Sequence, residues 1–170
     1  MLFYPHINGD KTLYSDPTLR GAFLGLSSDT GTAEMYNAVV EGLCFAFRQL
    51  GEAMGLNLAT LDVLKAVGGG AKSDFWLQTM ASVLNVRVER LSGAIGAGFG
   101  VALLAWRADH PGTSLEELTG ESLNAGRIFS PDSALTDAYQ EKYARYLRIH
   151  DALKYVEGGN SVQPLDRKAL

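Results

Sequence analysis

The chain contains 170 residues, of which 46% are hydrophobic and 20% charged, and its formal net charge is -4 at pH 7. This length allows one sizeable hydrophobic core and does not demand two domains. Because the charge is negative and no basic cluster stands out, we exclude a surface that neutralises nucleic-acid phosphates or anionic lipids. We also exclude a membrane protein, since no stretch approaches the run of about 20 apolar residues that spans a bilayer.

The sequence contains one cysteine, Cys44, and therefore no intramolecular disulfide. Its neighbours in residues 42–46 are mostly apolar, which predicts a thiol packed on the side of a helix. The first six residues lack the basic and then apolar arrangement of a secretion signal. We therefore expect a cytoplasmic protein in a reducing compartment.

The first third of the chain predicts a loop, a strand and a helix. Residues 1–20 are rich in turn-forming residues and predict a loop-rich lead-in. Residues 22–26 suit a short strand that enters a core. From residue 33 to residue 54, large apolar residues recur at spacings of three and four and predict a helix that Gly55 ends. The apolar stripe of this helix consists of Met35, Val39, Leu43, Phe47, Leu50 and Met54.

The middle of the chain alternates strands and helices. Residues 64–67 predict a strand, Gly68-Gly69-Gly70 follows at once, and residues 73–84 resume a helical pattern. Residues 86–90 alternate valines with charged residues, which predicts a strand with the valines on one face and the charges on the other. A helix over residues 96–106 opens among closely spaced glycines, whose small size favours close helix packing. This order is typical of an α/β layer.

The last part of the chain is predicted to be helical. Ser114 and Glu117 have the spacing of a capping box, which predicts a short peripheral helix. A terminal helix is expected over residues 130–157, and residues 158–170 are expected to form a flexible tail. The buried stripe of the terminal helix is predicted to include Tyr139, Tyr143 and Tyr146.

The glycine turn, Gly68-Gly69-Gly70, lies between a predicted strand and a predicted helix. Glycines leave main-chain amides open to a phosphate or a ribose, and the N-terminus of the following helix favours an anion there. The alternative is a tight connection in which glycine only provides unusual backbone dihedral angles. For the turn taken alone, these two interpretations stay equally open.

Two known phosphate-binding motifs do not fit this chain. Residues 71–73 are similar to the end of a Walker A loop, but alanine stands where that motif requires a glycine before the lysine. Residues 96–101 lack the third glycine of a dinucleotide fingerprint, since Val101 occupies its position. We therefore exclude a Walker-type loop and a dinucleotide site.

Several segments together have a spacing that is specific to one family of enzymes. They are residues 21–26 with Glu34-Met35 and residues 38–41, residues 67–73 with residues 75–78, residues 96–98 with Ala102 and Ala105, and residues 5–11. In the last segment, Asp10 and Lys11 replace the glutamate and arginine of the family pattern. Over residues 3–146 the chain resembles the C-terminal part of the FGGY carbohydrate kinases, with the xylulose kinases as the nearest subgroup.

The resemblance implies a fold and a cofactor. FGGY kinases have the actin-like ATPase architecture of two ribonuclease H-like lobes, so the expected fold is α/β, a mixed sheet flanked by helices with a C-terminal helical extension. In these kinases ATP lies between the lobes, and the C-terminal lobe holds its adenosine and α-phosphate. By this analogy residues 1–157 form the nucleotide-binding lobe. The implied cofactor is ATP or ADP, with Mg²⁺ carried by the nucleotide.

The residues that the resemblance assigns to the nucleotide lie in and after the glycine turn. They are Gly68, Gly69, Gly70, Ala71 and Ser73. Gly68 is expected to set the turn, and Ser73 to lie near the adenine edge, where relatives often have asparagine. Lys72 is interpreted as a solvent-facing residue.

The resemblance also implies that parts of the kinase have no counterpart in this chain. These are the aspartate that deprotonates the sugar hydroxyl, the lobe that supplies most sugar contacts, and the hairpin that holds the β- and γ-phosphates. Phosphoryl transfer depends on positioning and charge stabilisation, so we expect no catalytic residue here and no turnover by the chain alone.

The predicted function is therefore the nucleotide-binding portion of an ATP-dependent kinase for a pentulose such as D-xylulose. The sugar is expected to bind only together with the N-terminal lobe. The alternative is a non-enzymatic module that uses the same lobe for association, as a homo-oligomer for example, because a lobe without its partner exposes the surface between them.

The acidic residues have structural interpretations. Asp10, Glu34 and Asp74 are expected to be solvated or to cap backbone N–H groups. Glu41 lies in an apolar helix and within the family signature, and we expect an internal, hydrogen-bonded carboxylate.

The histidine and aromatic residues are interpreted in the same way. His6, His110 and His150 lie far apart in the sequence without the spacing of a metal site, so no metal site is expected. Phe75 and Trp76 follow the glycine turn closely, but they fit the core side of a helix better than a stacking surface for adenine.

Overall fold

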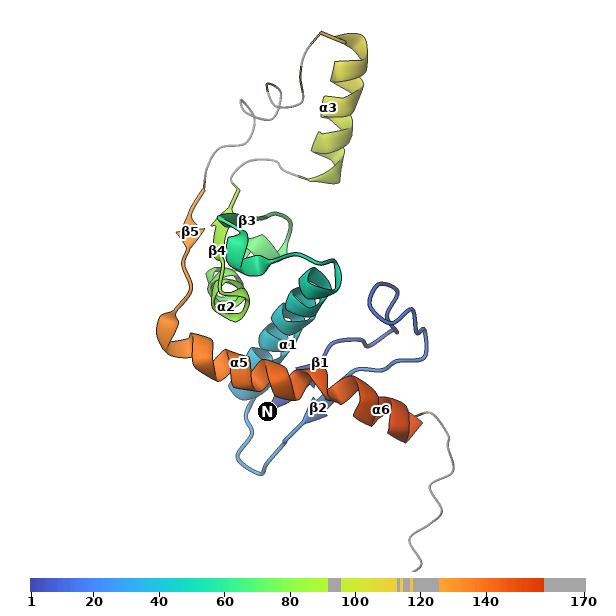
Figure 1. Ribbon diagram of the computed structural model, residues 1–170, viewed down its shortest axis with the longest axis vertical. Helices are drawn as coiled ribbons and strands as arrows, with labels where there is room; N and C mark the ends of the chain where they lie inside the picture. Colours follow the sequence, from blue (N-terminus) through green and yellow to red (C-terminus); the bar gives the residue numbers. More distant parts are fainter. Residues whose placement is uncertain (92–95, 113, 115–116, 118–125, 158–170) are drawn as a thin grey trace, which may run out of the picture. The chain divides into compact units, whose positions relative to one another are not determined.

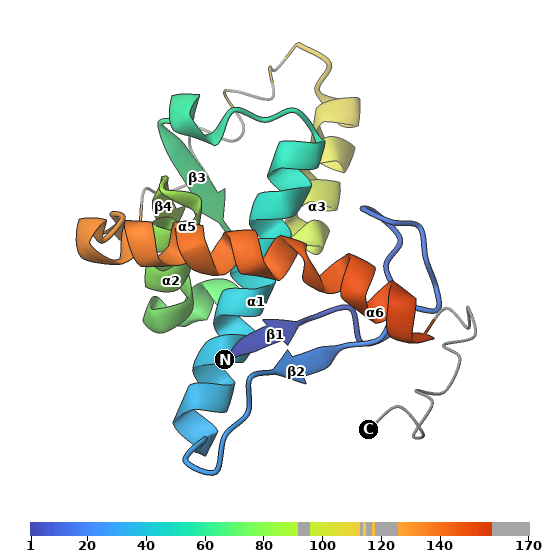
Figure 2. The ribbon, with the colours of Figure 1, turned by 60° about the horizontal axis from the view of Figure 1, so that its bottom comes forward.

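The computed structural model describes residues 1–91, 96–112, 114, 117 and 126–157 (Figure 1). The chain divides into two compact units. Unit 1 comprises Met1–Ala46 and Gln140–Leu170, and unit 2 comprises Phe47–Tyr139. Figure 2 shows the same elements from a second direction.

Unit 1 contains a two-stranded antiparallel ribbon. Strand β1, Leu2–Tyr4, pairs with strand β2, Ala22–Leu24, and all three residues of β1 are buried. The prediction of a loop throughout residues 1–20 is therefore wrong at β1, because three apolar residues are too few to show the period of a strand. Strand β2 ends earlier than predicted, since Gly25 has a φ of 79°.

Helix α1, Thr32–Ala53, contributes residues to both units. Its bounds agree with the helix predicted over residues 33–54, and Gly55, with a φ of 74°, follows its end as expected. At its start, the N–H of Gly31 donates to Oε2 of Glu34 at 3.0 Å. The capping role expected for Glu34 is confirmed.

The core face of α1 differs from the predicted stripe. Its buried side chains are Ala38, Val40, Cys44 and Phe45. In contrast, Phe47 and Met54 of the predicted stripe are 49% and 67% exposed. Within unit 1, α1 turns a small residue toward β1, because a Cβ on Gly42 would lie 2.3 Å from the carbonyl oxygen of Phe3. The close approach of the α1 and β1 backbones at Gly42 therefore determines which face of α1 is buried. The positions of the large apolar side chains do not determine it.

The C-terminal part of the described chain forms two helices. Helix α5 is Ser133–Leu147 and helix α6 is Ile149–Glu157. The single helix predicted over residues 130–157 is wrong at Arg148, whose N–H donates to the carbonyl of Arg145 at 3.3 Å in a tightened last turn.

The tyrosines of α5 pack on α1 within unit 1. Tyr143 and Tyr146 are buried, and their ring centroids lie 5.7 and 5.4 Å from that of Phe45. The structural role predicted for these two tyrosines is confirmed. Tyr139, which belongs to unit 2, is half-buried.

Unit 2 contains a three-stranded mixed sheet in the order β3-β4-β5. Strand β3, Val63–Ala66, is parallel to strand β4, Arg87–Arg90, and strand β5, Ile128–Phe129, is antiparallel to β4. Helix α2, Asp74–Leu84, lies between β3 and β4 in the chain and packs against β4 and β5. The predicted order of strand, helix and strand is confirmed, whereas β5 is too short for a sequence pattern.

The core of unit 2 is built by α2 and the sheet. Its buried residues include Leu77, Ala81, Val83, Leu84, Val86, Val88 and Phe129. Both valines of the predicted strand, Val86 and Val88, are buried, but Glu89 is also buried. The charged residues of β4 therefore do not all face solvent.

The remaining elements of unit 2 lie around this core. A short 3₁₀ helix, Leu58–Thr60, precedes β3, and helix α3, Ala97–Asp109, follows β4. None of the residues of α3 is buried, and a Cβ on Gly98 or Gly100 would meet no described atom within 4 Å. The close packing expected for these glycines is therefore wrong.

Two predictions fall partly or wholly outside the described residues. The N–H of Ser114 donates to Oε2 of Glu117 at 2.9 Å, and the N–H of Glu117 donates to Oγ of Ser114 at 3.1 Å. This confirms the capping box, while the rest of that helix and the predicted tail, residues 158–170, lie outside. No helix in the described ranges is long and apolar enough to cross a bilayer.

Candidate functional site

The glycine turn begins directly after β3. Gly68 has a φ of 89°, which strongly favours glycine, so the turn that we expected this residue to set does depend on it. A second 3₁₀ helix, Gly70–Lys72, follows, in which the N–H of Lys72 donates to Gly69 at 3.2 Å and that of Ser73 donates to Gly70 at 3.1 Å. The turn is therefore an ordered connection into α2.

The backbone of the turn is exposed. Gly68, Gly69 and Gly70 are all exposed, and a Cβ on either of the first two would meet no described atom within 4 Å. A Cβ on Gly70 would lie 3.7 Å from the ring of Trp76, an ordinary contact. The protein thus leaves space open above the first part of the turn.

A cavity of about 330 Å³ lies at this exposed face. It is lined by Val67, Gly68, Gly69, Ala71, Lys72, Arg90 and Leu91. The cavity brings together three of the predicted nucleotide residues and two cationic side chains. Gly70 and Ser73 do not line it, and the assignment of all five residues to the nucleotide stays a prediction.

Ser73 has a structural role at the start of α2. Its Oγ accepts a hydrogen bond from the N–H of Trp76 at 3.2 Å and caps the helix. The hydroxyl can still donate one hydrogen bond to a ligand. Lys72 is exposed, as expected.

Sequence reasoning missed a group of charged residues next to the turn. Arg90 donates from Nε to the carbonyl oxygen of Ala71 at 2.7 Å and pairs through a terminal nitrogen with Asp74. Arg127 pairs with the other carboxylate oxygen of Asp74. Both guanidinium groups lie over the ring of Phe129, 5.3 and 4.8 Å from its centroid.

A signal in the sequence could have predicted the position of Arg90. Arg90 is the last residue of β4 and is the register partner of Ala66, the last residue of β3. Carboxyl ends of parallel strands meet at one edge of a sheet, where ligands bind in open α/β folds. A parallel pairing of the two predicted strands would have placed Arg90 beside the glycine turn.

Asp74 is held in its charged form by this group. The hydrogen bond from Arg90, with the charges of Arg127 and Arg90, keeps the pKa of Asp74 below its ordinary value. Asp74 is the first residue of α2, where a negative charge is favourable. Its carboxylate is ion-paired, and the purely solvated role that we considered does not describe it.

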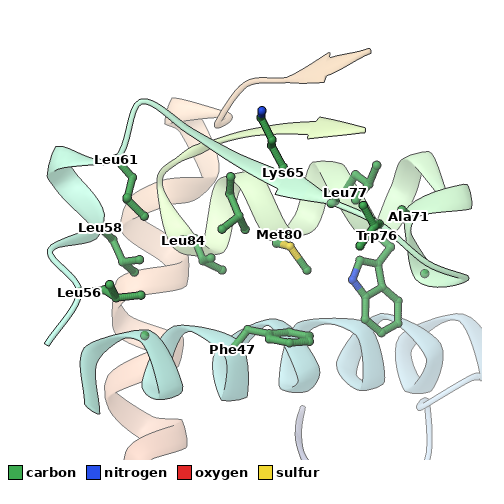
Figure 3. Close-up of a pocket in the computed structure, with 15 residues that line it drawn as sticks. Phe47, Leu56, Leu58, Leu61, Lys65, Ala71, Trp76, Leu77, Met80 and Leu84 are labelled. Atoms are coloured by element: carbon green, nitrogen blue, oxygen red, sulfur yellow. The ribbon is translucent and has the colours of Figure 1, made fainter. Parts of the chain in front are cut away.

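A second, apolar cavity of about 500 Å³ lies beside β3 and α2 and reaches the turn at one end (Figure 3). Its lining includes Phe47, Leu64, Trp76, Met80 and Leu84. Trp76 is half-buried and points into this space, but Phe75 is 44% exposed, so the core position predicted for Phe75 is wrong.

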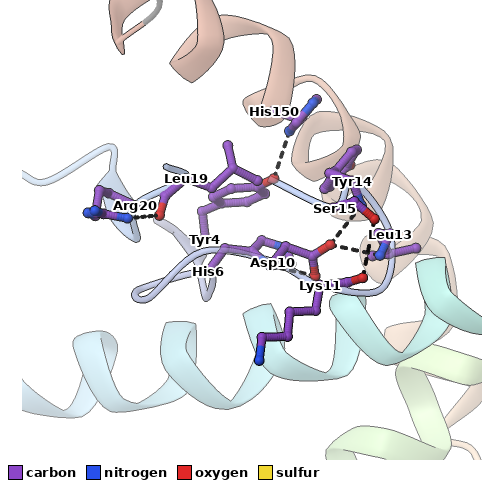
Figure 4. A network of polar contacts seen from close by, with 10 residues as sticks. All are labelled: Tyr4, His6, Asp10, Lys11, Leu13, Tyr14, Ser15, Leu19, Arg20 and His150. Carbon is purple, nitrogen blue, oxygen red and sulfur yellow. Dashed lines mark hydrogen bonds and ion pairs between the residues drawn. The ribbon is translucent and has the colours of Figure 1, made fainter. Parts of the chain in front are cut away.

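Unit 1 contains a separate polar cluster around Tyr4 (Figure 4). Nδ1 of His6 lies 3.3 Å from Oδ1 of Asp10, and Oδ2 of Asp10 accepts bonds of 2.7 Å from the N–H groups of Leu13 and Tyr14. The backbone-capping role expected for Asp10 is confirmed. Within the described ranges, no group of His, Cys, Asp and Glu side chains is placed to hold a metal ion.

Glu41 forms an ion pair inside unit 1. Its Oε2 accepts a hydrogen bond from Nζ of Lys142, and the Glu41 side chain is only 14% exposed. The internal, hydrogen-bonded carboxylate that we expected at this position is confirmed.

Comparison with known proteins identifies relatives of this chain in sequence and in structure. Residues 1–108 match the C-terminal domain of the FGGY family of carbohydrate kinases. A xylulose kinase of Staphylococcus epidermidis is 30% identical over 154 residues, which cover 91% of this chain and 31% of that protein. A glycerol kinase of Alcanivorax borkumensis is 36% identical over 161 residues, which cover 89% of this chain and 30% of that protein. The crystal structure of a ligand-bound xylulose kinase from Lactobacillus acidophilus has a TM-score of 0.81 at 28% identity, covering 94% of this chain and 32% of that one.

These matches define a class of protein, the kinases that act on carbohydrates. This chain belongs to the FGGY family and carries its C-terminal domain. The family resemblance and the actin-like ATPase fold predicted from the sequence are confirmed. The chain spans about a third of the length of the curated relatives that it matches.

Proposed function

We propose that this chain is the nucleotide-binding portion of an ATP-dependent kinase that phosphorylates a pentulose such as D-xylulose. The observation that carries this proposal is the conformation of Gly69. Its φ of -62° and ψ of -42° are allowed for any residue, and a Cβ here would meet no described atom within 4 Å. Among the described residues, neither backbone geometry nor packing requires glycine at this position, and this supports a ligand that approaches the main chain there.

The chemistry of the turn suits a nucleotide phosphate. The exposed backbone of Gly68 and Gly69 and the exposed cationic Lys72 line one cavity, and each favours an anion. In this proposal the backbone of residues 68–71 contacts ATP or ADP, and the Ser73 hydroxyl donates to it. Mg²⁺ is carried by the nucleotide phosphates, its usual ligands in kinases.

The sugar and the complete reaction rest on relatives. Xylulose kinases among them support a pentulose substrate, and the glycerol kinase supports the broader class of polyhydroxylated acceptors. We propose that the sugar contacts and the catalytic base belong to a second lobe, so the chain alone does not turn over ATP. Its location in the cytoplasm stays a prediction.

Calorimetry with ADP tests the nucleotide site. Gly69→Val and Gly70→Val place side chains on the turn and are expected to abolish most of the binding heat of the unaltered chain. Gly112→Val is the matched control, since Gly112 lies in unit 2, does not line the cavity at the turn, and has no described atom within 4 Å of its Cβ position. Equal heats for all four chains would refute the site.

A second candidate function is association without catalysis, and helix α3 favours it. Its apolar residues Val101, Leu104 and Trp106 are 65%, 58% and 45% exposed. Exposed apolar surface of this kind drives self-association. Light scattering over a concentration series, with and without ADP, separates the two: an ADP-binding monomer supports the kinase portion, and an oligomer that ignores nucleotide supports the association module.

A further inference from the structure

We infer that Arg90 is a positioning residue for the nucleotide turn. This inference rests on the proposed function, because the turn that Arg90 holds is the proposed nucleotide site. In this role Arg90 does not react with substrate. It fixes the carbonyl of Ala71 and the start of α2, so that the amides of the turn keep their orientation toward the ligand.

The first argument is the position of Arg90 in the sheet. It ends β4, opposite Ala66 at the end of β3, so its side chain starts from the edge of the sheet where the turn begins. From there Nε reaches the carbonyl of Ala71 at 2.7 Å. Ala71 is 8% exposed, in contrast with the exposed glycines before it, so the turn is anchored at its buried end.

The second argument is the way in which Arg90 itself is held. Asp74 accepts hydrogen bonds from Arg90 and Arg127, and Phe129 lies beneath both guanidinium groups. The two contacts of Arg90 use different nitrogens of one planar group, an arrangement that lysine cannot reproduce. The Arg90 side chain is 27% exposed, so water competes only partly for these bonds.

The third argument is charge. Arg90 lines the cavity above the turn, but its guanidinium is paired with Asp74, whereas Lys72 in the same cavity is exposed. A guanidinium that already has a carboxylate partner offers less free charge to a phosphate. Its contribution is therefore mainly the geometry of the turn.

The test compares Arg90→Gln and Arg90→Lys with Arg87→Gln. Arg87 is a close match on the same strand: its Nε donates to the carbonyl of Asp62 at 3.2 Å, and a terminal nitrogen pairs with the Asp62 carboxylate. The first readout is hydrogen exchange of the Lys72 and Ser73 amides, which close the turn. The second is the Kd for ADP.

Arg90→Gln is expected to speed exchange of both amides about tenfold or more, and to weaken ADP binding by a similar factor, because a charged hydrogen bond is lost. Arg87→Gln should leave both readouts unchanged, because the ion pair of Arg87 with Asp62 lies away from the lining of the turn's cavity. Arg90→Lys keeps one contact in place of two, so its exchange rates and its Kd for ADP should lie between those of the unaltered chain and those of Arg90→Gln. Equal effects of Arg90→Gln and Arg87→Gln, or full recovery with lysine, would overturn the inference.

Failure of the proposed function gives a different result. If the unaltered chain gives no ADP binding, the nucleotide site is refuted, but the exchange rates of Lys72 and Ser73 still report whether Arg90 orders the turn. Faster exchange in Arg90→Gln alone then supports the positioning role, and unchanged exchange contradicts it.

Discussion

The hydroxyl of Tyr4 and Nδ1 of His150 lie 3.1 Å apart, although 146 positions separate the two residues in the sequence. This hydrogen bond joins strand β1 to helix α6 inside unit 1. The ring of Tyr14 stacks on that of His150, with centroids 3.5 Å apart and an interplanar angle of 6°. The imidazole of His150 is therefore buried, with the Tyr4 hydroxyl at its Nδ1 and the Tyr14 ring against its face.

This enclosure predicts a pH dependence of stability. Burial, and then the charge of Lys154, lower the pKa of His150 below 6.5, against the opposing pull of Asp151, Asp16 and Asp10. Burial likewise lowers the pKa of His6. Between these lowered values and 6.5 the unfolded chain binds more protons than the folded one, so the stabilisation is complete above 6.5 and falls as the pH drops through this range.

The measurement is urea unfolding at about pH 7.5 and about pH 5.5. The midpoint is expected to be lower at the acidic pH. His150→Gln should lose part of this difference, and His110→Gln, at an exposed position, should retain it. A midpoint that is equal or higher at the acidic pH would contradict the prediction.

Two glycines of α1 predict opposite effects of the same substitution. Gly42→Ala places a Cβ 2.3 Å from the carbonyl oxygen of Phe3, and we expect a loss of about 1–3 kcal/mol in the free energy of unfolding. Gly51→Ala places a Cβ 3.5 Å from a methyl group of Leu58, an ordinary contact, and should gain up to about 1 kcal/mol. Chemical denaturation measures both. A stabilising Gly42→Ala would show that β1 does not approach α1 so closely.

The ion pair of Glu41 and Lys142 predicts a measurable contribution to stability. Both side chains are mostly buried, at 14% and 28% exposed, so Lys142→Gln leaves a carboxylate without its partner. We expect a loss of about 1–2 kcal/mol. Lys154→Gln is the control, because Lys154 is 55% exposed and lies 3.9 Å from Asp16, and should cost less than about 0.5 kcal/mol. Equal losses for the two variants would rule out a special role for the buried pair.

Local signals in the sequence predicted the local features of this fold. The extent of α1, the glycine after it, and the turn between β3 and α2 depend on neighbouring residues, and all three were predicted. The family spacing then gave the fold, which no periodicity alone specifies.

Features that depend on distant pairing were not predicted. Strands β1 and β5 are too short to be recognised from their own residues. Each is defined by its pairing with a neighbouring strand, β1 with β2 and β5 with β4. The core face of α1 was wrong because the approach of β1 at Gly42 cannot be seen in the spacing of large residues. Arg90 was missed for the same reason, since only the parallel register of β3 and β4 brings it to the glycine turn.

The measurement that tests the central claim most directly is an NMR titration of the chain with ADP, followed at the backbone amides. We predict saturable chemical-shift changes that are largest at Gly69, Gly70 and Ala71, extend to Ser73, and are absent from Gly69→Val. The amides of β1 and β2 in unit 1 should not respond. Absence of saturable shifts, or shifts centred outside the glycine turn, would contradict the assignment of this turn to the nucleotide.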